Sequence, residues 1–180
     1  MTKEAKMKRD LSIPDAVTAS FEDNTLHIKG ENGELSRVFS HPDFTISVAN
    51  DTISIQCIKG RREQKALIGT YVAHINNMIR GVTDGFEYQM KTVYSHFPIK
   101  TNVEGNMFVV QNFLGERAPR KALILDGVTV EAKGDNITVK GMDKEKVGQT
   151  VANIERATSV SRRDIRVFQD GIYRISRGEN

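Results

Sequence analysis

The chain has 180 residues, of which 38% are hydrophobic and 27% are charged, so it fits one ordinary globular domain or two small ones and not a disordered chain. A net charge of +3 and an isoelectric point near 9.0 permit a polyanionic partner but do not require one. Cys57 is the only cysteine, which excludes an intrachain disulfide and a cysteine-based metal cage. The sequence shows neither a signal peptide nor a run of roughly 20 apolar residues that could span a membrane, so we expect a cytoplasmic protein.

Alternating apolar and polar residues predict half-buried strands in the first third of the chain. The alternation is clear at residues 17–21, 26–28, 46–48 and 53–55. Turn-forming pairs separate these segments: Asp23-Asn24, Asn32-Gly33 and Asn50-Asp51. Asn-Gly is the strongest short signal for a β-hairpin, because both residues tolerate positive φ.

The period then changes to that of a helix between about residues 64 and 80. The apolar residues recur at intervals of three and four and form one stripe: Ile68, Tyr71, Val72, Ile75, Met78 and Ile79. Gly81 stands where a glycine is expected to end the helix.

The same order of elements recurs in the second half of the chain. Residues 51–55 resemble 135–139, the hairpin at 22–34 resembles 104–116, and the helical segment 68–75 resembles 147–154. Differences in spacing fall in loops, where insertions are tolerated. We therefore predict an α+β fold of two tandem homologous domains, residues 1–81 and 82–180, each a mostly antiparallel β-sheet packed against one α-helix.

Four local features add detail to this prediction. Gly69 and Gly148 occupy matching helix positions. Because glycine inside a helix costs roughly 1 kcal/mol relative to alanine, the repeated glycine suggests that the helix approaches the sheet closely. The alternative is that they are two unrelated surface glycines. Asp143 is expected to cap the second helix. Residues 86–94 predict a strand that could pair back onto the first domain, and residues 165–175 predict a last hairpin around Asp170-Gly171.

Motifs for catalysis or metal binding are absent from the sequence. The histidines His27, His41, His74 and His96 are not spaced as metal ligands, and Cys57 lies in a strand pattern as a buried residue would. Phosphate-binding, dinucleotide-binding and hydrolase motifs are missing as well. We expect neither an enzyme nor a cofactor.

The basic residues are more informative because they form clusters. One cluster precedes the first helix: Lys59, Arg61, Arg62 and Lys65. The second surrounds Pro119: Arg117, Arg120 and Lys121. The third gives the C-terminal stretch six arginines: Arg156, Arg162, Arg163, Arg166, Arg174 and Arg177. A solvated charged face would explain any single cluster, but three together favour a phosphate backbone, which the planar guanidinium fits well. With no aromatic pair of the kind that stacks single-stranded bases, we expect RNA shape and backbone to be recognised.

Four segments carry a resemblance to a known family. They are residues 77–90 (NMIRGVTDGFEYQM), 94–99 (YSHFPI), 112–121 (NFLGERAPRK) and 163–173 (RDIRVFQDGIY). Together they resemble the ribosomal protein six family of the large subunit, and the last segment is similar to its archaeal and eukaryotic branch. The likeness extends from about residue 13 to 176, and Arg156 departs from it in a position where glutamine is expected.

The resemblance implies a duplicated α+β protein of the large ribosomal subunit without catalytic activity. It implies binding to large-subunit rRNA, mainly through the C-terminal domain, near the factor-binding region and the sarcin–ricin loop, with neighbouring ribosomal proteins and translation factors close by. Gly171 and Tyr173 would form a tight turn and a stacking or packing ring, unless Tyr173 simply closes the core. The predicted rRNA-binding residues are Arg117, Arg120, Lys121, Arg162, Arg163, Arg166, Tyr173, Arg174 and Arg177.

Two other functions remain open at this point. Edge strands of the two sheets could accept a strand from a partner, which would make the chain a protein-binding module. A small enzyme using paired carboxylates is the third possibility and would require two close carboxylates in a deep pocket.

Overall fold

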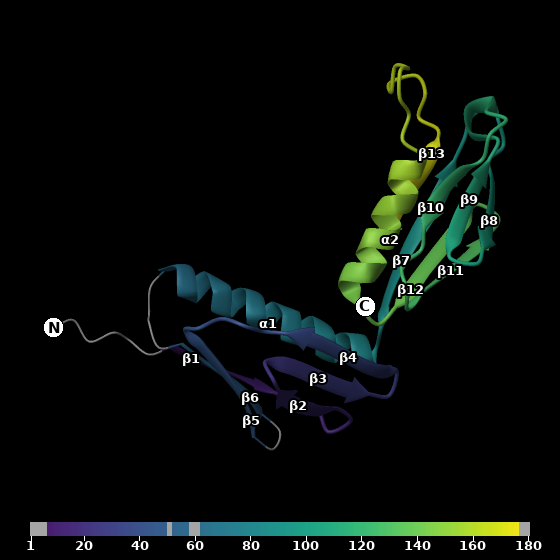
Figure 1. The fold of residues 1–180 in the computed structure, drawn as a ribbon. Helices are drawn as coiled ribbons and strands as arrows, with labels where there is room; N and C mark the ends of the chain where they lie inside the picture. The colour runs from purple at the N-terminus through teal and green to yellow at the C-terminus, as the bar shows by residue number, and fades with distance from the viewer. Residues whose placement is uncertain (1–6, 50–51, 58–61, 177–180) are drawn as a thin grey trace. The chain divides into compact units, whose positions relative to one another are not determined.

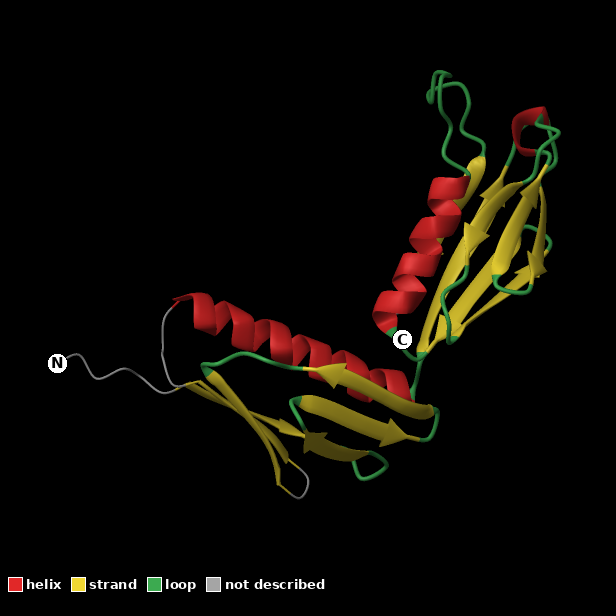
Figure 2. Cartoon of the chain, viewed as in Figure 1, coloured by secondary structure: helices red, strands yellow, loops and turns green. Residues whose placement is uncertain are grey.

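A computed structural model describes residues 7–49, 52–57 and 62–176 (Figure 1). The chain divides into two compact units, residues 1–84 and 85–180, which we call unit 1 and unit 2. Each unit contains antiparallel strands and one long helix (Figure 2), so the predicted α+β fold of two tandem domains is confirmed. The division falls three residues beyond the boundary that the sequence suggested.

Unit 1 consists of two three-stranded antiparallel sheets and the helix α1 (Arg62–Thr83). One sheet has the order β1-β6-β5: β1 (Met7–Ser12), β6 (Thr52–Cys57) and β5 (Phe44–Ala49). The other has the order β2-β3-β4: β2 (Thr18–Glu22), β3 (Thr25–Gly30) and β4 (Gly33–Val38). The apolar stripe of α1 packs against residues such as Leu26, Ile28, Ile53 and Ile55, all of which are fully buried.

Unit 2 repeats this plan and adds one strand. One sheet has the order β10-β9-β8: β10 (Arg120–Leu123), β9 (Met107–Gln111) and β8 (Lys100–Glu104). The other has the order β11-β12-β7-β13: β11 (Val128–Lys133), β12 (Asn136–Gly141), β7 (Phe86–Val93) and β13 (Gly171–Ser176). The helix α2 (Lys144–Ala157) contributes Val147, Val151 and Ile154 to the core, and a short 3₁₀ helix η1 (Phe113–Gly115) follows β9.

Hydrogen-bond partners show the duplication directly. In unit 1, β6 pairs with β1 on one side and β5 on the other; in unit 2, β12 pairs with β7 and β11 in the same way. The β2-β3-β4 sheet corresponds to β8-β9-β10. The added strand β13 pairs with the free edge of β7.

Several local predictions are confirmed. Asp23 and Asn24 both have positive φ and form the turn between β2 and β3. The turn before Gly33 joins β3 to β4, although Gly33 itself already belongs to β4. Asp143 caps α2, since its side chain accepts a hydrogen bond from the backbone N–H of Glu145 at 2.9 Å. The predicted turn at residues 50–51 lies outside the described residues.

The predicted end of the first helix is wrong. Gly81 is buried inside α1, which continues to Thr83. Gly85, with φ +73, is the residue that takes the left-handed conformation after the helix. The helix extends because Val82 is completely buried and contributes one more apolar contact to the core.

The interpretation of the helix glycines is also wrong. A Cβ atom built on Gly69 or Gly148 meets nothing within 4 Å, so neither glycine marks a close contact with a sheet. The close approaches occur at the strand glycines instead. A Cβ on Gly30 would lie 2.8 Å from the Val82 side chain, and a Cβ on Gly141 would lie 2.7 Å from Val147.

Two strands differ from the sequence prediction. The strand at 86–94 forms as β7 (Phe86–Val93), and its partners are β12 and β13 of unit 2. The last hairpin does not form, because residues 165–170 are irregular and only β13 is a strand. The strand β1, which pairs with β6, was not predicted because its charged residues Lys8, Arg9 and Asp10 hide the alternation.

Candidate nucleic-acid interface

Three irregular segments meet at one end of unit 2. They are residues 94–99, 112–119 and 158–170, and we call this end of unit 2 the loop end (Figure 2). A Cβ on Gly115 would lie 3.3 Å from the ring of Phe97, so the first two segments are in contact. Arg120 joins the second segment to the third through Glu116 and the carbonyl of Ser159.

Arg120 connects β10 to the end of α2. Its Nε and Nη2 atoms donate to the two carboxylate oxygens of Glu116 at 2.8 and 2.7 Å. Its Nη1 donates to the backbone carbonyls of Ala157 and Ser159, both at 3.0 Å. The guanidinium also lies 4.3 Å from the ring centre of Phe113. Most of the donors of Arg120 are therefore used inside the protein.

The carboxylate of Glu116 is stabilised in its charged form by these contacts. The hydrogen bond from Arg120 is the main cause of the lowered pKa of Glu116, and the positive charges of Arg120 and Arg163 lower that pKa further. Because Arg163 belongs to the 158–170 segment, its influence on Glu116 indicates that these two segments lie close together. Opposite charges within a few ångströms favour the ionised carboxylate.

Asp164 organises the arginine-rich part of the 158–170 segment. Its side chain accepts from the backbone N–H of Arg166 at 2.9 Å, and its carbonyl accepts from Val167 and Phe168 at 3.1 and 2.9 Å. Arg163 lies over the ring of Phe168, 4.9 Å from its centre. An aspartate that bonds the backbone two residues ahead is a common way to order a turn. The exposed arginines of this segment are therefore carried by an ordered turn: Arg162, Arg163 and Arg166.

Tyr173 lies on the surface at the start of β13. It is 49% exposed, so the idea that it closes the core is wrong. Its ring lies over Gly171, where a Cβ would come within 3.1 Å of the ring atoms, and its hydroxyl donates to the carbonyl of Gln169 at 3.1 Å. A Cβ at position 171 would therefore crowd the ring of Tyr173, and Gly171 is not among the glycines with positive φ.

The strand β13 is held by the end of α2. The Oγ1 atom of Thr158 accepts from the backbone N–H of Ile172 at 3.1 Å, and Thr158 is buried. The carboxylate of Glu155 accepts from the backbone N–H of Arg174 at 3.1 Å. These bonds fix the strand that carries Tyr173 and the exposed Arg174.

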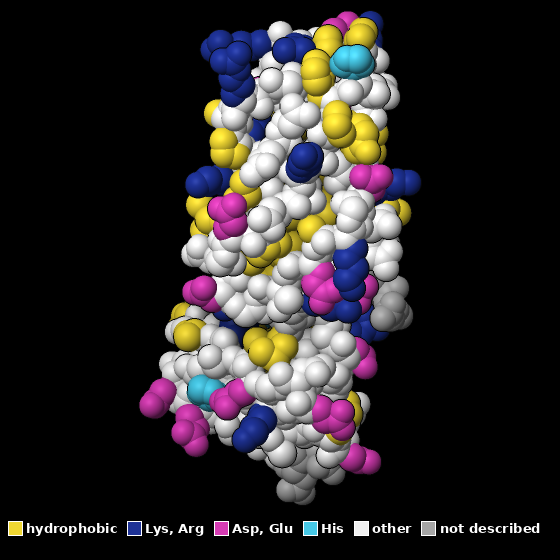
Figure 3. Space-filling model, turned by 90° about the vertical axis from the view of Figure 1, so that its right-hand side faces the viewer, with side chains coloured by type: hydrophobic (Ala, Val, Ile, Leu, Met, Phe, Trp, Pro, Cys, Tyr) yellow, Lys and Arg dark blue, Asp and Glu magenta, His cyan; other side chains and the backbone are white. Residues whose placement is uncertain are grey.

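The structure brings eight of the nine predicted residues to the loop end or to the strands that start there. Arg177 lies outside the described residues, as do Lys59 and Arg61 of the first cluster. Arg62 and Lys65 lie at the start of α1 in unit 1. On the face shown in Figure 3, basic side chains gather at the loop end beside exposed hydrophobic ones.

Some residues of the loop end were missed by the sequence analysis. Lys91 is exposed and lies opposite Tyr173 in the β7-β13 pair, and Lys100 is exposed at the start of β8. Phe97 is 39% exposed and stacks edge-on with His96 at 4.8 Å between ring centres. These residues stand alone in the sequence, so only the tertiary structure reveals that they lie at the same end of unit 2 as the arginines.

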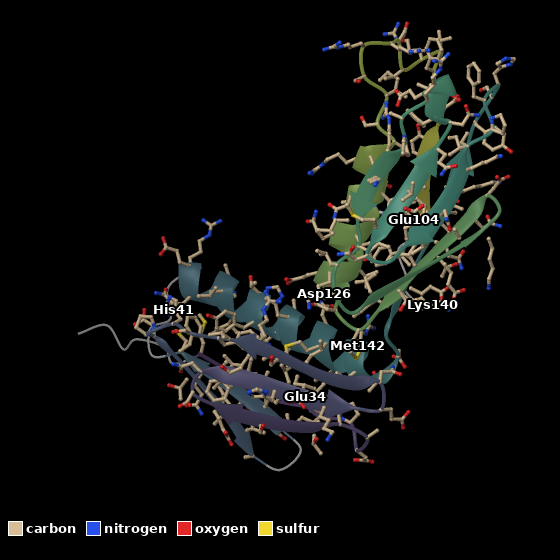
Figure 4. The ribbon with its side chains drawn as sticks, turned by 45° about the vertical axis from the view of Figure 1, so that its right-hand side comes forward. Glu34, His41, Glu104, Asp126, Lys140 and Met142 are labelled. Atoms are coloured by element: carbon tan, nitrogen blue, oxygen red, sulfur yellow. The ribbon has the colours of Figure 1, made fainter. Side chains whose placement is uncertain are left out.

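Glu116, Asp164 and Asp170 belong to the loop end, while other acidic residues of unit 2 lie away from it. Glu104 ends β8 and Asp126 follows β10, each at the opposite end of its strand from the loop end (Figure 4). Lys140 pairs with Glu87 at 3.0 Å across β12 and β7, which lowers the pKa of Glu87 and raises that of Lys140.

Within the described residues, no group of three or more His, Cys, Asp or Glu side chains is placed to hold a metal ion. No helix in the described part of the chain combines the length and apolar character needed to cross a membrane.

Comparison with known proteins decides the family. The family model described as Ribosomal protein L6 matches the chain twice, at residues 13–85 and 97–171. The chain belongs to the ribosomal protein L6 family. The two matches correspond to the two units, so the internal duplication is confirmed. Members of this family are structural components of the large ribosomal subunit in the cytoplasm, and the chain is not an enzyme.

Archaeal relatives of the L6 family are similar over almost their whole length. The large ribosomal subunit protein uL6 of Methanothrix thermoacetophila is 50% identical over 169 residues, which cover 94% of this chain and 96% of the relative. The protein of the same name from Methanobrevibacter smithii is 46% identical over 177 residues, which cover 98% of this chain and 99% of the relative. The resemblance to the archaeal branch is thereby confirmed.

Proposed function

We propose that this L6-family protein binds large-subunit rRNA through the loop end of unit 2. The observation that supports this most is the gathering of exposed basic residues from separate parts of the chain on one end of one unit: Arg117, Lys121, Arg162, Arg163, Arg166 and Arg174. A set of this kind, carried by ordered turns and strands, suits a phosphate backbone of fixed shape. Unit 2 is then the main rRNA-binding domain.

The members of the set have different roles in this proposal. Arg162, Arg163 and Arg166 bind phosphates, because they are exposed on an ordered turn. Arg120 positions the two loops and does not itself bind phosphate, since Glu116 and two carbonyls already occupy its donors. Tyr173 offers a half-exposed ring beside Lys91, which suits packing against a sugar or a base.

The place on the ribosome is a further part of the proposal. By resemblance to the family, the loop end binds near the factor-binding region and the sarcin–ricin loop, with translation factors close by. The exposed apolar side chains of Ile165 and Val167, at 69% and 70% exposure, suit contact with a neighbouring ribosomal protein at the same end. Crosslinking from position 165 in large subunits would identify the rRNA segment and the protein that lie there.

A salt titration tests the RNA binding. Affinity of the full chain for large-subunit rRNA should fall steeply with salt, because each neutralised phosphate releases counterions and adds roughly 0.9 to the negative slope of log K against log salt. Replacing Arg162, Arg163 and Arg166 with glutamate should flatten that slope by about 2 to 3. A flat dependence in the unchanged protein would contradict the proposal.

A matched control distinguishes a specific RNA contact at the loop end from an effect of the net charge of the chain. The triple change Lys29→Glu, Arg62→Glu and Lys65→Glu alters the total charge by the same amount but lies in unit 1. The proposal predicts a much smaller loss of affinity for this variant. If the unit 1 variant loses more affinity than the loop-end variant, the main RNA contact lies in unit 1 instead.

A further inference from the structure

The two units differ at one edge of their corresponding sheets. In unit 2, β7 pairs with β12 on one side and with β13 on the other. In unit 1, the corresponding strand β1 pairs with β6 on one side, and no strand within the described residues pairs with its other edge. The N–H and C=O groups along such an edge can bind a further strand. The described residues of unit 1 therefore include no counterpart of the strand β13 that completes the sheet of unit 2.

A groove lies along this edge of β1. It has a volume of about 680 Å³ and runs between β1 and the first half of α1. Residues of β1 and α1 line it: Met7, Lys8, Arg9, Asp10, Leu11, Lys65, Ile68, Gly69 and Val72. In unit 2, β13 pairs with β7 and contacts α2. Unit 2 therefore already holds a strand at the place that the groove occupies in unit 1.

The groove combines an apolar floor with basic residues. Ile68 is 3% exposed, while Leu11 and Val72 are half-buried and pack against the core of unit 1. Arg9 lies opposite the buried Ile55, so strand alternation places it on the helix-facing side, yet it is exposed. Lys65 of α1 supplies a second cation.

Among the described residues that line the groove, Asp10 is the one acidic residue, and its carboxylate already has partners. Asp10 accepts a hydrogen bond from Ser54 at 2.6 Å and pairs with Lys8 at 3.0 Å. These contacts lower the pKa of Asp10, the bond from Ser54 most strongly. The groove therefore presents the positive charges of Arg9 and Lys65 to whatever enters it.

We propose that the edge of β1 binds an extended segment of another protein as an additional antiparallel strand. On its face towards α1 the segment would carry apolar residues, which pack on Ile68 and Val72, and also acidic residues, which pair with Arg9 and Lys65, because all these side chains lie on the helix side of β1. Main-chain hydrogen bonds to the strand edge supply affinity, and the side chains on that face supply specificity. An RNA backbone could use the two cations but neither the apolar floor nor the free strand edge, so a peptide fits the groove better. This site is independent of the proposed RNA contact in unit 2.

The test uses the full chain labelled with ¹⁵N and a synthetic acetylated peptide, Val-Thr-Glu-Thr-Val-Thr-Glu, in which Val and Glu share one face of the strand. The peptide should shift the backbone signals of Lys8, Arg9 and Asp10 and slow the hydrogen exchange of β1. A peptide with lysine in place of glutamate should bind more weakly, because it would meet Arg9 and Lys65 with like charge. If the signals of β1 do not move, or if an RNA duplex moves them and the peptide does not, the proposal is overturned. Self-association through β1, detected by sedimentation equilibrium, would overturn it in favour of a second copy.

Gly69 allows the groove to be blocked without disturbing the fold. A Cβ at Gly69 meets nothing within 4 Å, and leucine is a better helix former than glycine. In Gly69→Leu, the new side chain should fill the groove and weaken peptide binding by about tenfold or more. The matched control is Gly148→Leu, at the corresponding position of α2, where a Cβ also meets nothing. This control should bind the peptide as the unchanged chain does, and equal effects of the two changes would overturn the proposal.

Discussion

Replacing Arg120 with alanine should destabilise unit 2 and leave unit 1 unchanged. The side chain is 24% exposed and joins Glu116 to the carbonyls of Ala157 and Ser159. It therefore links segments that lie about 40 residues apart in the sequence. Without it, β10 keeps a polar contact with α2 through Asn153, which donates to the carbonyl of Leu123, but loses its bonds to the carbonyls of Ala157 and Ser159.

The magnitude follows from the separate contacts. The pair with Glu116 is worth about 0.5–1 kcal/mol, since Glu116 is 41% exposed and water screens the charges. The two carbonyl bonds contribute about 1 kcal/mol together, because only the carbonyl of Ala157 is partly buried. The contact with the ring of Phe113 adds about 0.5–1 kcal/mol. Together we expect a loss of ~2–3 kcal/mol in the free energy of unfolding of unit 2.

Urea denaturation followed by NMR measures the stability of both units in one sample. Amide signals of Val110 and Ile154 report on the core of unit 2, and those of Ile28 provide an internal reference in unit 1. In Arg120→Ala, only the unit 2 midpoint should fall. Arg120→Lys keeps the charge but not the planar fork, so it should recover less than half of the loss. Arg117→Ala is the exposed control and should change stability by less than about 0.5 kcal/mol.

The dependence on pH gives a second measurement of the same contact. The pKa of Glu116 is lowered in the folded protein from an ordinary value of 4.5. The resulting stabilisation is fully present above about pH 4.5 and is lost as the pH falls through the lowered pKa of the folded state. The difference in stability between the unchanged chain and Arg120→Ala should therefore shrink in acid. A loss below about 0.5 kcal/mol at neutral pH, or a difference that grows in acid, would refute this account of Arg120.

Two further changes test packing and strand attachment. Gly30→Ala should destabilise unit 1 by about 1–3 kcal/mol, because its Cβ would lie 2.8 Å from both the side chain and the carbonyl of Val82. The urea midpoints of the unit 1 signals measure this loss. An unchanged midpoint would show that the end of α1 can move away freely. Thr158→Val should leave the backbone N–H of Ile172 without its buried acceptor and cost about 1–3 kcal/mol locally. Faster hydrogen exchange along β13, with β9 unaffected, is the expected result, whereas unchanged exchange in β13 would mean that pairing with β7 alone holds the strand.

Much of the fold could be predicted because its signals are local. The alternation around Leu26, Ile28, Ile53 and Ile55 was visible in the sequence, and all four are fully buried in the structure. The charged strand β1 was missed, since at the edge of a sheet only Met7 and Leu11 need to be apolar. The end of α1 was misplaced because Gly81 carries a helix-ending signal that the burial of Val82 overrides.

The candidate site was only partly predictable. The arginine clusters could be recognised from composition alone, but Lys91, Lys100 and Phe97 could not, because each is isolated in the sequence. Arg117 and Arg120 look equivalent in the sequence, whereas one is exposed and the other is held by Glu116 and two carbonyls. Which donors remain available for a ligand depends on partners supplied by distant segments.

Apart from β1 and the last hairpin, the sequence by itself determined the order of strands and helices, their repetition and the presence of basic clusters, because periodicity and composition are properties of neighbouring residues. Only the tertiary structure decided which arginines share a surface with Tyr173, and which glycines lie in close contacts: Gly30 and Gly141, and neither Gly69 nor Gly148. It also showed that β13 completes the sheet of unit 2, while no described strand pairs with the corresponding edge of β1. The physical reason is that contacts between segments distant in the chain form only after the sheets and helices pack, and no local pattern records them.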